Sequence, residues 1–132
     1  MLRIAWENGV VFSGKRVLDV GCGSGATTIR IAQEASSVTA LDLSEEMLRL
    51  LKEDAQALGI HNITPVLASW DDFEIDERFG IVFAGTTPAI RDDTSREKLV
   101  RFSKDWVIFI GFAAWMISDM TTELLKHYGL TP

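Results

Sequence analysis

The sequence contains little cysteine and no concentration of positive charge. A single cysteine, Cys22, excludes a disulfide within the chain and favours a reducing compartment, so we expect a cytoplasmic protein. The 13 Lys and Arg residues are scattered among 19 Asp and Glu residues, which gives a net charge of −6. A nucleic-acid surface needs a basic patch, so we expect no nucleic-acid partner.

Long apolar runs and clusters of metal ligands are also missing. No apolar stretch reaches the roughly 18 residues of a membrane span, and the first residues lack a signal-peptide pattern, so we expect no membrane partner. His61 and His127 have no cysteine or acidic cluster at ligand spacing, which predicts no metal site. The 132 residues, 47% apolar and 24% charged, are typical of one globular domain spanning 1–132.

Strand-like and helix-like segments alternate along the chain. Five apolar segments predict strands, at 16–20, 37–42, 63–68, 80–84 and 106–112. Helical spacing predicts helices at 26–35, from Ser44 to Gly59, and after a capping box at Thr94-Ser95-Arg96-Glu97. This alternation predicts a Rossmann-like α/β fold, an open and mostly parallel sheet with helices on both faces. Its ligand should lie beyond the carboxyl ends of the strands.

Three alternate glycines follow the first predicted strand. Gly21, Gly23 and Gly25 form a tight loop before a helix that starts at Ala26. Glycine accepts a positive φ and lets a ligand lie against the backbone, and the helix N-terminus presents unpaired N–H groups. The loop therefore predicts a binding site for a nucleotide or a nucleoside.

Two classes of ligand fit this loop. The segment Gly21-Cys22-Gly23-Ser24-Gly25-Ala26 satisfies the dinucleotide fingerprint, and Asp42 follows about 20 residues later, as a ribose-binding acid should. An NAD-binding domain is therefore one interpretation. Asp19 favours a ligand with a cationic amino acid end, because a carboxylate two residues before the first glycine would be unfavourable beside a pyrophosphate.

With Asp19 included, the loop resembles the first motif of class I S-adenosylmethionine-dependent methyltransferases. That motif is Asp19-x-Gly21-x-Gly23-x-Gly25, and the segment from Val38 to Ser44, in which Asp42 ends a strand, resembles their second motif. The resemblance implies that Asp42 binds both ribose hydroxyls, and that Asp19 shapes the loop and helps receive the methionine ammonium group. It also implies strand order 3-2-1-4-5, S-adenosylmethionine as cofactor, S-adenosylhomocysteine as product, and a small-molecule methyl acceptor.

The resemblance implies a set of cofactor-binding positions on the loops that follow the strands. These are Asp19, Gly21, Cys22, Gly23, Gly25, Asp42, Leu43, Met47, Ser69, Trp70 and Ala84. Met47 either touches the adenine or packs in its helix, and Trp70 either flanks the adenine or fills the sheet edge. Ser69 stands where the family often has an acid near the adenine amino group, so Asp71 or Asp72 could replace it.

The substrate-facing segment departs from the family pattern. The residues 84–89 lack the (Asp/Asn)-Pro-Pro-aromatic signature, so neither DNA nor protein glutamine is assigned as acceptor. Thr86 and Thr87 either hydrogen-bond the methionine end or a substrate, or are ordinary loop residues. No residue has the context of a general base, so no catalytic residue is assigned.

Both edges of the predicted sheet carry expectations. Pro65 cannot donate to a ladder and places strand 63–68 at one edge. Strand 106–112 forms the other edge, apolar and without proline or charge, and we expect a second copy, a partner or residues beyond the given sequence to cover it. The chain stops where the family's C-terminal hairpin would begin, so this hairpin is expected to be missing. A donor-binding module without transfer activity is therefore a further alternative.

Overall fold

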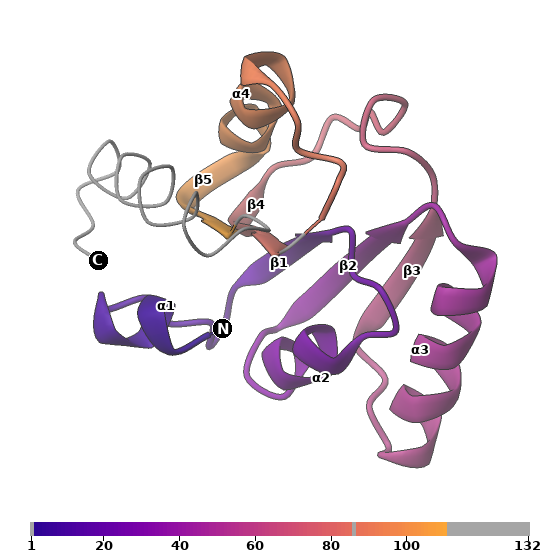
Figure 1. The fold of residues 1–132 in the computed structure, drawn as a ribbon. Coiled ribbons are helices and arrows are strands. Elements are labelled where there is room, and N and C mark those ends of the chain that lie inside the picture. The colour runs from indigo at the N-terminus through magenta and orange to yellow at the C-terminus, as the bar shows by residue number, and fades with distance from the viewer. Residues whose placement is uncertain (1, 86, 111–132) are drawn as a thin grey trace.

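Five parallel strands form the centre of the molecule. The structure is a computed structural model that describes residues 2–85 and 87–110. The sheet has the order β3-β2-β1-β4-β5, and each neighbouring pair is parallel (Figure 1). The strands are β1 (Arg16–Val20), β2 (Ser37–Asp42), β3 (Ile63–Leu67), β4 (Phe79–Gly85) and β5 (Ser103–Ile110). The predicted fold class and strand order are confirmed.

Helices cover both faces of the sheet. The helices α1 (Arg3–Glu7), α2 (Ala26–Ala32) and α3 (Glu45–Ala57) lie on one face, and α4 (Asp93–Phe102) lies on the other (Figure 1). On the first face Val17 of β1 shares a buried cluster with Ile31 of α2. On the second face Val82 of β4 shares a buried cluster with Leu99 of α4. Each face is therefore apolar because it packs under helices, as an all-parallel sheet requires.

The strand order reverses beside β1. From β1 the chain crosses to β2 and β3 on one side, and later returns to β4 and β5 on the other. Asp19 of β1 lies in register with Ala40 of β2 and with Phe83 of β4. The carboxyl ends of these three strands therefore meet at one edge of the sheet, where ligands bind in open α/β folds.

The two edge strands differ in how far they match the prediction. Pro65 lies in β3, which pairs with β2 alone among the described strands, so its edge position is confirmed. The strand β5 begins at Ser103 rather than at residue 106 and includes the exposed residues Lys104 and Asp105. The expectation of an uncharged edge strand is therefore wrong. Residues 111 and 112, and the predicted lack of a C-terminal hairpin, lie outside the described residues.

The N-terminus of α4 also differs from the prediction. The N-cap is Asp92, whose Oδ1 accepts the N–H of Ser95 at 2.8 Å, while the Ser95 hydroxyl accepts the N–H of Asp92 at 3.1 Å. The expected capping box from Thr94 to Glu97 is wrong, because Asp92 makes the reciprocal pair two residues earlier. A second helix start was predicted correctly, since the Ser44 hydroxyl accepts the N–H of Met47 at 3.2 Å.

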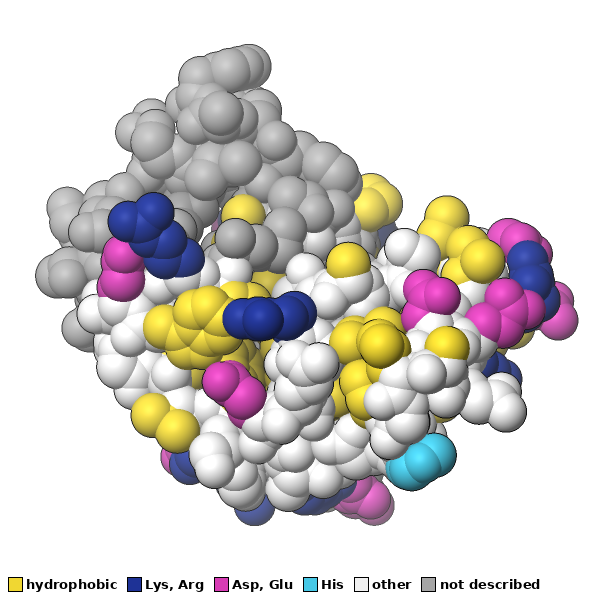
Figure 2. Space-filling model, turned by 90° about the horizontal axis from the view of Figure 1, so that it is seen from below, with side chains coloured by type: hydrophobic (Ala, Val, Ile, Leu, Met, Phe, Trp, Pro, Cys, Tyr) yellow, Lys and Arg dark blue, Asp and Glu magenta, His cyan; other side chains and the backbone are white. Residues whose placement is uncertain are grey.

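Surface charges are paired rather than grouped by sign. On α3, for example, Arg49 pairs with both Glu46 and Glu53. Figure 2 shows Lys and Arg side chains lying apart from one another on one face of the molecule, several of them beside acidic groups. Within residues 2–85 and 87–110, no helix is long and apolar enough to cross a membrane. The same part of the chain brings together no group of three or more His, Cys, Asp or Glu side chains that could hold a metal ion.

Candidate functional site

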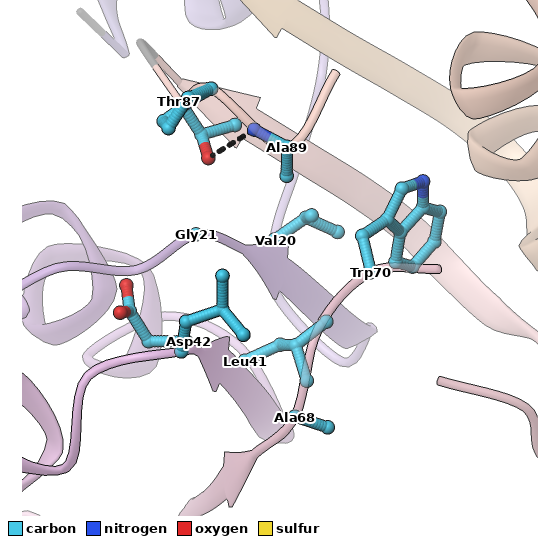
Figure 3. A pocket seen from close by; sticks show the side chains of 10 residues that line it. Val20, Gly21, Leu41, Asp42, Ala68, Trp70, Thr87 and Ala89 are labelled. Atoms are coloured by element: carbon cyan, nitrogen blue, oxygen red, sulfur yellow. Dashed lines mark hydrogen bonds between the residues drawn. The ribbon is translucent and has the colours of Figure 1, made fainter. Parts of the chain in front are cut away.

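A pocket opens beyond the carboxyl ends of the central strands. It is lined by Val20, Gly21, Leu41, Asp42, Leu43, Ala68, Trp70, Thr87, Pro88 and Ala89 (Figure 3). Its cavity volume is about 150 Å³, and the pocket is partly open to solvent. The lining comes from four chain segments, each at or after the end of a different strand. The predicted location of the ligand site therefore coincides with a cavity.

Asp42 supplies the charged group of this pocket. Its Oδ2 accepts the backbone N–H of Gly23 at 2.8 Å, and its Oδ1 accepts the backbone N–H of Ser44 at 2.9 Å. These bonds fix the carboxylate between the glycine loop and the start of α3. In Figure 3 it lies on the opposite side of the pocket from Trp70. A carboxylate can accept about four hydrogen bonds, so both oxygens retain capacity for the hydroxyls of a ligand.

The three loop glycines have different physical roles. All three have positive φ, at +71° for Gly21, +59° for Gly23 and +95° for Gly25. A Cβ on Gly21 would lie 2.1 Å from Oγ1 of Thr87, and one on Gly25 would lie 2.2 Å from Cδ1 of Leu51. Only at Gly23 would a Cβ meet nothing within 4 Å. Two glycines are therefore needed for protein packing, and Gly23 alone borders open space.

Asp19 lies beneath the loop and does not line this pocket. Its side chain is only 2% exposed, and its Oδ2 accepts the hydroxyl of Thr28 at 2.6 Å. Burial raises the pKa of Asp19 to about 6; the Thr28 hydrogen bond opposes this shift and the charge of Asp42 adds to it. Its contact with α2 is consistent with shaping the loop.

Cys22 lies in the glycine loop with its thiol half-buried. Its backbone N–H donates to the Leu41 carbonyl at 3.0 Å, and its sulfur lies 3.5 Å from the Gly23 carbonyl oxygen. Burial raises the pKa of Cys22 to about 12, with the charges of Asp19 and Asp42 acting in the same direction. The thiol therefore stays protonated at neutral pH and has no nucleophilic character.

Seven positions assigned by the resemblance do not line this pocket, namely Asp19, Cys22, Gly23, Gly25, Met47, Ser69 and Ala84. Ala84 is fully buried in the core cluster under α4, and Met47 is 38% exposed in the first turn of α3. The hydroxyl of Ser69 accepts the N–H of Asp72 at 3.0 Å, which closes a local turn. Asp71, one alternative to Ser69, pairs with Arg91 at 2.6 Å.

Trp70 belongs both to the pocket wall and to the core, and its contact with the adenine stays a prediction. It lines the pocket, and its ring also packs in the core, stacked on Phe73 with 6.1 Å between ring centroids. Its indole N–H donates to the Ser95 carbonyl at 3.0 Å. The wall that Trp70 forms is therefore attached to α4.

The segment after β4 forms a wall that the motifs did not identify. Thr87, Pro88 and Ala89 all line the pocket, and the Thr87 hydroxyl accepts the N–H of Ala89 at 3.2 Å. Thr87 was one of two open possibilities in the sequence. Neither Pro88 nor Ala89 has a side chain typical of a binding site. Only their position after a central strand could have predicted that they line the pocket.

Comparisons with known proteins agree with this arrangement. A family model described as a methyltransferase domain matches residues 17–106, more than half of the chain. The chain is 36% identical over 101 residues to a probable cobalt-precorrin-6B C(15)-methyltransferase (decarboxylating) of Thermoplasma acidophilum, covering 72% of this chain and 50% of that protein. It is 32% identical over 75 residues to a probable (S)-tetrahydroprotoberberine N-methyltransferase 2 of Papaver bracteatum, covering 55% of this chain and 21% of that protein.

A solved structure shows the same relationship. The S-adenosylmethionine dependent methyltransferase from Mesorhizobium loti superposes with a TM-score of 0.60 at 26% identity, covering 71% of this chain and 44% of that one. The chain thus spans half or less of the length of each of these relatives. The matched region contains the glycine loop, Asp42, the strands β1 to β4 almost entirely and the first half of β5. The chain belongs to the class I S-adenosylmethionine-dependent methyltransferase family.

Proposed function

We propose that this chain binds S-adenosylmethionine in the pocket at the ends of β1 and β2, and that it supports methyl transfer to a small-molecule acceptor. The observation that carries the proposal is the Asp42 carboxylate, which two backbone N–H groups hold at the pocket while its lone pairs remain available. The ribose hydroxyls would donate to Asp42. The adenine would then extend along Leu41 and Ala68 towards Trp70, a largely apolar path.

The charge of the pocket favours the methyl donor over NAD. Its lining includes one acid, Asp42, and neither Lys nor Arg, while a second acid, Asp19, lies beneath the loop. A sulfonium and an ammonium group are attracted to such a site, whereas a pyrophosphate would be repelled. Gly23 offers the open backbone position beside which the donor can lie.

Methyl transfer from a sulfonium requires little acid–base catalysis by the protein. The acceptor attacks the sulfonium methyl in line, the carbon–sulfur bond breaks, and the thioether product leaves with the electron pair. The protein has mainly to hold donor and acceptor close and collinear, which is equivalent to an effective molarity of about 10⁵–10⁸ M at best. We assign no general base.

The acceptor is proposed only as a class. The two relatives named above carry a nitrogen and a carbon methyltransferase name, so their shared part is the donor side. We propose a small molecule as acceptor, residues 1–132 acting as one domain, and a cytoplasmic location. We also propose that the side of β5 away from β4 is covered by a second copy of the chain, by a partner or by residues beyond the given sequence, because β5 pairs with β4 alone among the described strands.

Calorimetry with S-adenosylhomocysteine and with NAD tests the donor site. The wild type should bind S-adenosylhomocysteine, and Asp42→Ala should weaken this binding by at least about tenfold, since it removes a charge-assisted hydrogen-bond acceptor. Asp54→Ala, at an exposed position of α3, is the matched control and should bind like the wild type.

Each outcome separates one interpretation from the others. Tight binding of NAD, or S-adenosylhomocysteine binding that ignores Asp42→Ala, would refute the proposed site. Transfer assays with labelled S-adenosylmethionine and a panel of small metabolites then distinguish an enzyme from a donor-binding module without activity.

A further inference from the structure

The wall of the pocket formed by Trp70 is attached to a helix that does not itself touch the pocket. Trp70 follows β3, but its indole N–H donates to the Ser95 carbonyl of α4 at 3.0 Å. Ser95 is also the residue that closes the capping box of α4. The position of the Trp70 ring is therefore tied to α4 as well as to the end of β3.

Lys98 of α4 makes the second attachment. Its side chain is only 9% exposed, which is unusual for a lysine and calls for polar partners. The ammonium donates to the backbone carbonyl of Trp70, lies 3.4 Å from the carbonyl oxygen of Asp71, and lies 3.5 Å from Oε1 of Glu74. The buried ammonium therefore holds two consecutive backbone carbonyls, those of Trp70 and Asp71.

The same ammonium also contacts the aromatic ring. It lies 4.8 Å from the centroid of the Trp70 ring, within the range of a cation–π interaction. The backbone carbonyl and the ring of Trp70 are therefore both held by one group. Lys98 itself does not line the pocket. Among the pocket-lining residues, Trp70 is the one that Lys98 contacts in the described structure.

We propose that Lys98 is a positioning residue for the adenine end of the pocket, acting through the backbone and the ring of Trp70. This inference rests on the proposed function, because it assigns a role within that donor site. The energetic reason is that a buried ammonium with three donors fixes the carbonyl and ring directions together. A neutral, unbranched side chain would occupy much of the same space but would remove the hydrogen bond to the Trp70 carbonyl and the cation–π contact with its ring.

The test is a double-mutant cycle on the affinity for S-adenosylhomocysteine. Lys98→Met keeps an unbranched, flexible side chain one atom shorter and removes the charge, and it should weaken binding by about tenfold. Trp70→Phe shrinks the ring and removes the bond to Ser95. In the Trp70→Phe background, the effect of Lys98→Met should fall to about threefold or less, because the indole whose orientation Lys98 fixes is absent and the bond to the backbone carbonyl of residue 70 is the main contact that remains.

Arg101→Met is the matched control. Arg101 is an exposed cation of the same helix, and it pairs with Glu74 at 2.9 Å without contacting Trp70. Its substitution should leave the affinity of the wild type and of Trp70→Phe unchanged. Circular dichroism and urea unfolding of every variant show whether a loss of binding merely follows a loss of fold. If Lys98→Met does not fold, Lys98→Gln replaces it in the same cycle.

The outcomes separate this inference from the proposed function. If the wild type fails to bind S-adenosylhomocysteine, the proposed function is wrong. If the wild type binds but Lys98→Met binds equally well, the positioning role is wrong. Effects of Lys98→Met and Trp70→Phe that simply add would also refute it, because they would show that Lys98 acts independently of the ring.

Discussion

Asp19 is a carboxylate enclosed by protein on the underside of a loop. Burial raises its pKa to about 6, above the value of about 3.9 in an unfolded chain. Between these two values the folded state binds more protons than the unfolded state, so the free energy of unfolding decreases as pH rises from about 4 to 6. At neutral pH the ionised Asp19 therefore opposes folding.

Asp19→Asn should make the protein more stable at neutral pH. The amide can still accept the Thr28 hydroxyl but carries no charge to desolvate. The variant should match the wild type near pH 4 and exceed it at pH 7.5, by no more than about 3 kcal/mol. Urea unfolding at both pH values measures this difference, with the exposed Asp54→Asn as control. A variant less stable than the wild type at pH 7.5 would contradict the account.

Weaker binding of S-adenosylhomocysteine by Asp19→Asn would indicate that the acid is kept for function at the expense of stability.

Two glycines of the same loop should respond differently to alanine. Gly21→Ala and Gly23→Ala both place a side chain at positive φ, which costs about 1–2 kcal/mol. Only at Gly21 does the new Cβ also overlap the side chain of Thr87. Gly21→Ala should therefore be more destabilising than Gly23→Ala by about 1–3 kcal/mol in urea unfolding. Equal losses would show that Thr87 moves aside freely.

The sequence predicted the chemistry of the site better than its walls. The alternate glycines and the acid that ends β2 have a spacing that only a few structures require, so they identified the loop and Asp42. Trp70 was left between flanking the adenine and filling the sheet edge; its ring packs in the core beside the pocket, and its contact with the adenine stays a prediction. Ser69 and Met47 were placed by analogy with the family, yet their side chains here serve a turn and an exposed helix face. Such choices depend on backbone direction after a strand, which residue types alone do not determine.

At the scale of elements, the central strands were the most predictable part. β1 and β2 have the predicted bounds, because each is a short apolar run whose ends are marked by charge or glycine. The start of α4 was misplaced by two residues, since Thr94-x-x-Glu97 and Asp92-x-x-Ser95 both have the form of a helix start. The choice between them depends on which residue has an extended backbone, and Asp92 has φ −152°.

The observed cap of α4 gives a direct comparison. Asp92→Ala should lower the midpoint of thermal unfolding by a few degrees, because it removes the acceptor for the N–H of Ser95. Thr94→Ala should change it little, since Thr94 lies one residue inside the helix. Calorimetric scans at pH 7 measure both. The hydrogen bonds from Ser95 lower the pKa of Asp92, so this contribution is present at neutral pH and is lost as pH falls through the lowered pKa. A larger decrease in the unfolding midpoint for Thr94→Ala than for Asp92→Ala would instead support the capping box predicted from Thr94 to Glu97.

At the scale of the whole molecule, the alternation of strands and helices predicted the parallel sheet and the family resemblance predicted its strand order, whereas neither identified what lies beside β5. We expect the protein to be a dimer, or to need a partner, at this edge. Light scattering should give a mass above that of the monomer, and the amides of residues 106–110 should exchange slowly with deuterium. The amides of β3, the opposite edge, are the internal control and should exchange faster. A monodisperse monomer whose β5 amides exchange freely would rule this out.

The pocket lining is drawn from four strand ends that are far apart along the chain. No fragment containing one or two β-α units can present the complete set of walls, so the hollow arises only when the sheet is assembled. Any small molecule that fills it consequently acts as a reporter of correct assembly and adds about 2.7 kcal/mol to the global unfolding free energy at a hundredfold excess over its dissociation constant. The abundance of the ligand in a cell would in this way set how long the folded chain survives proteolysis.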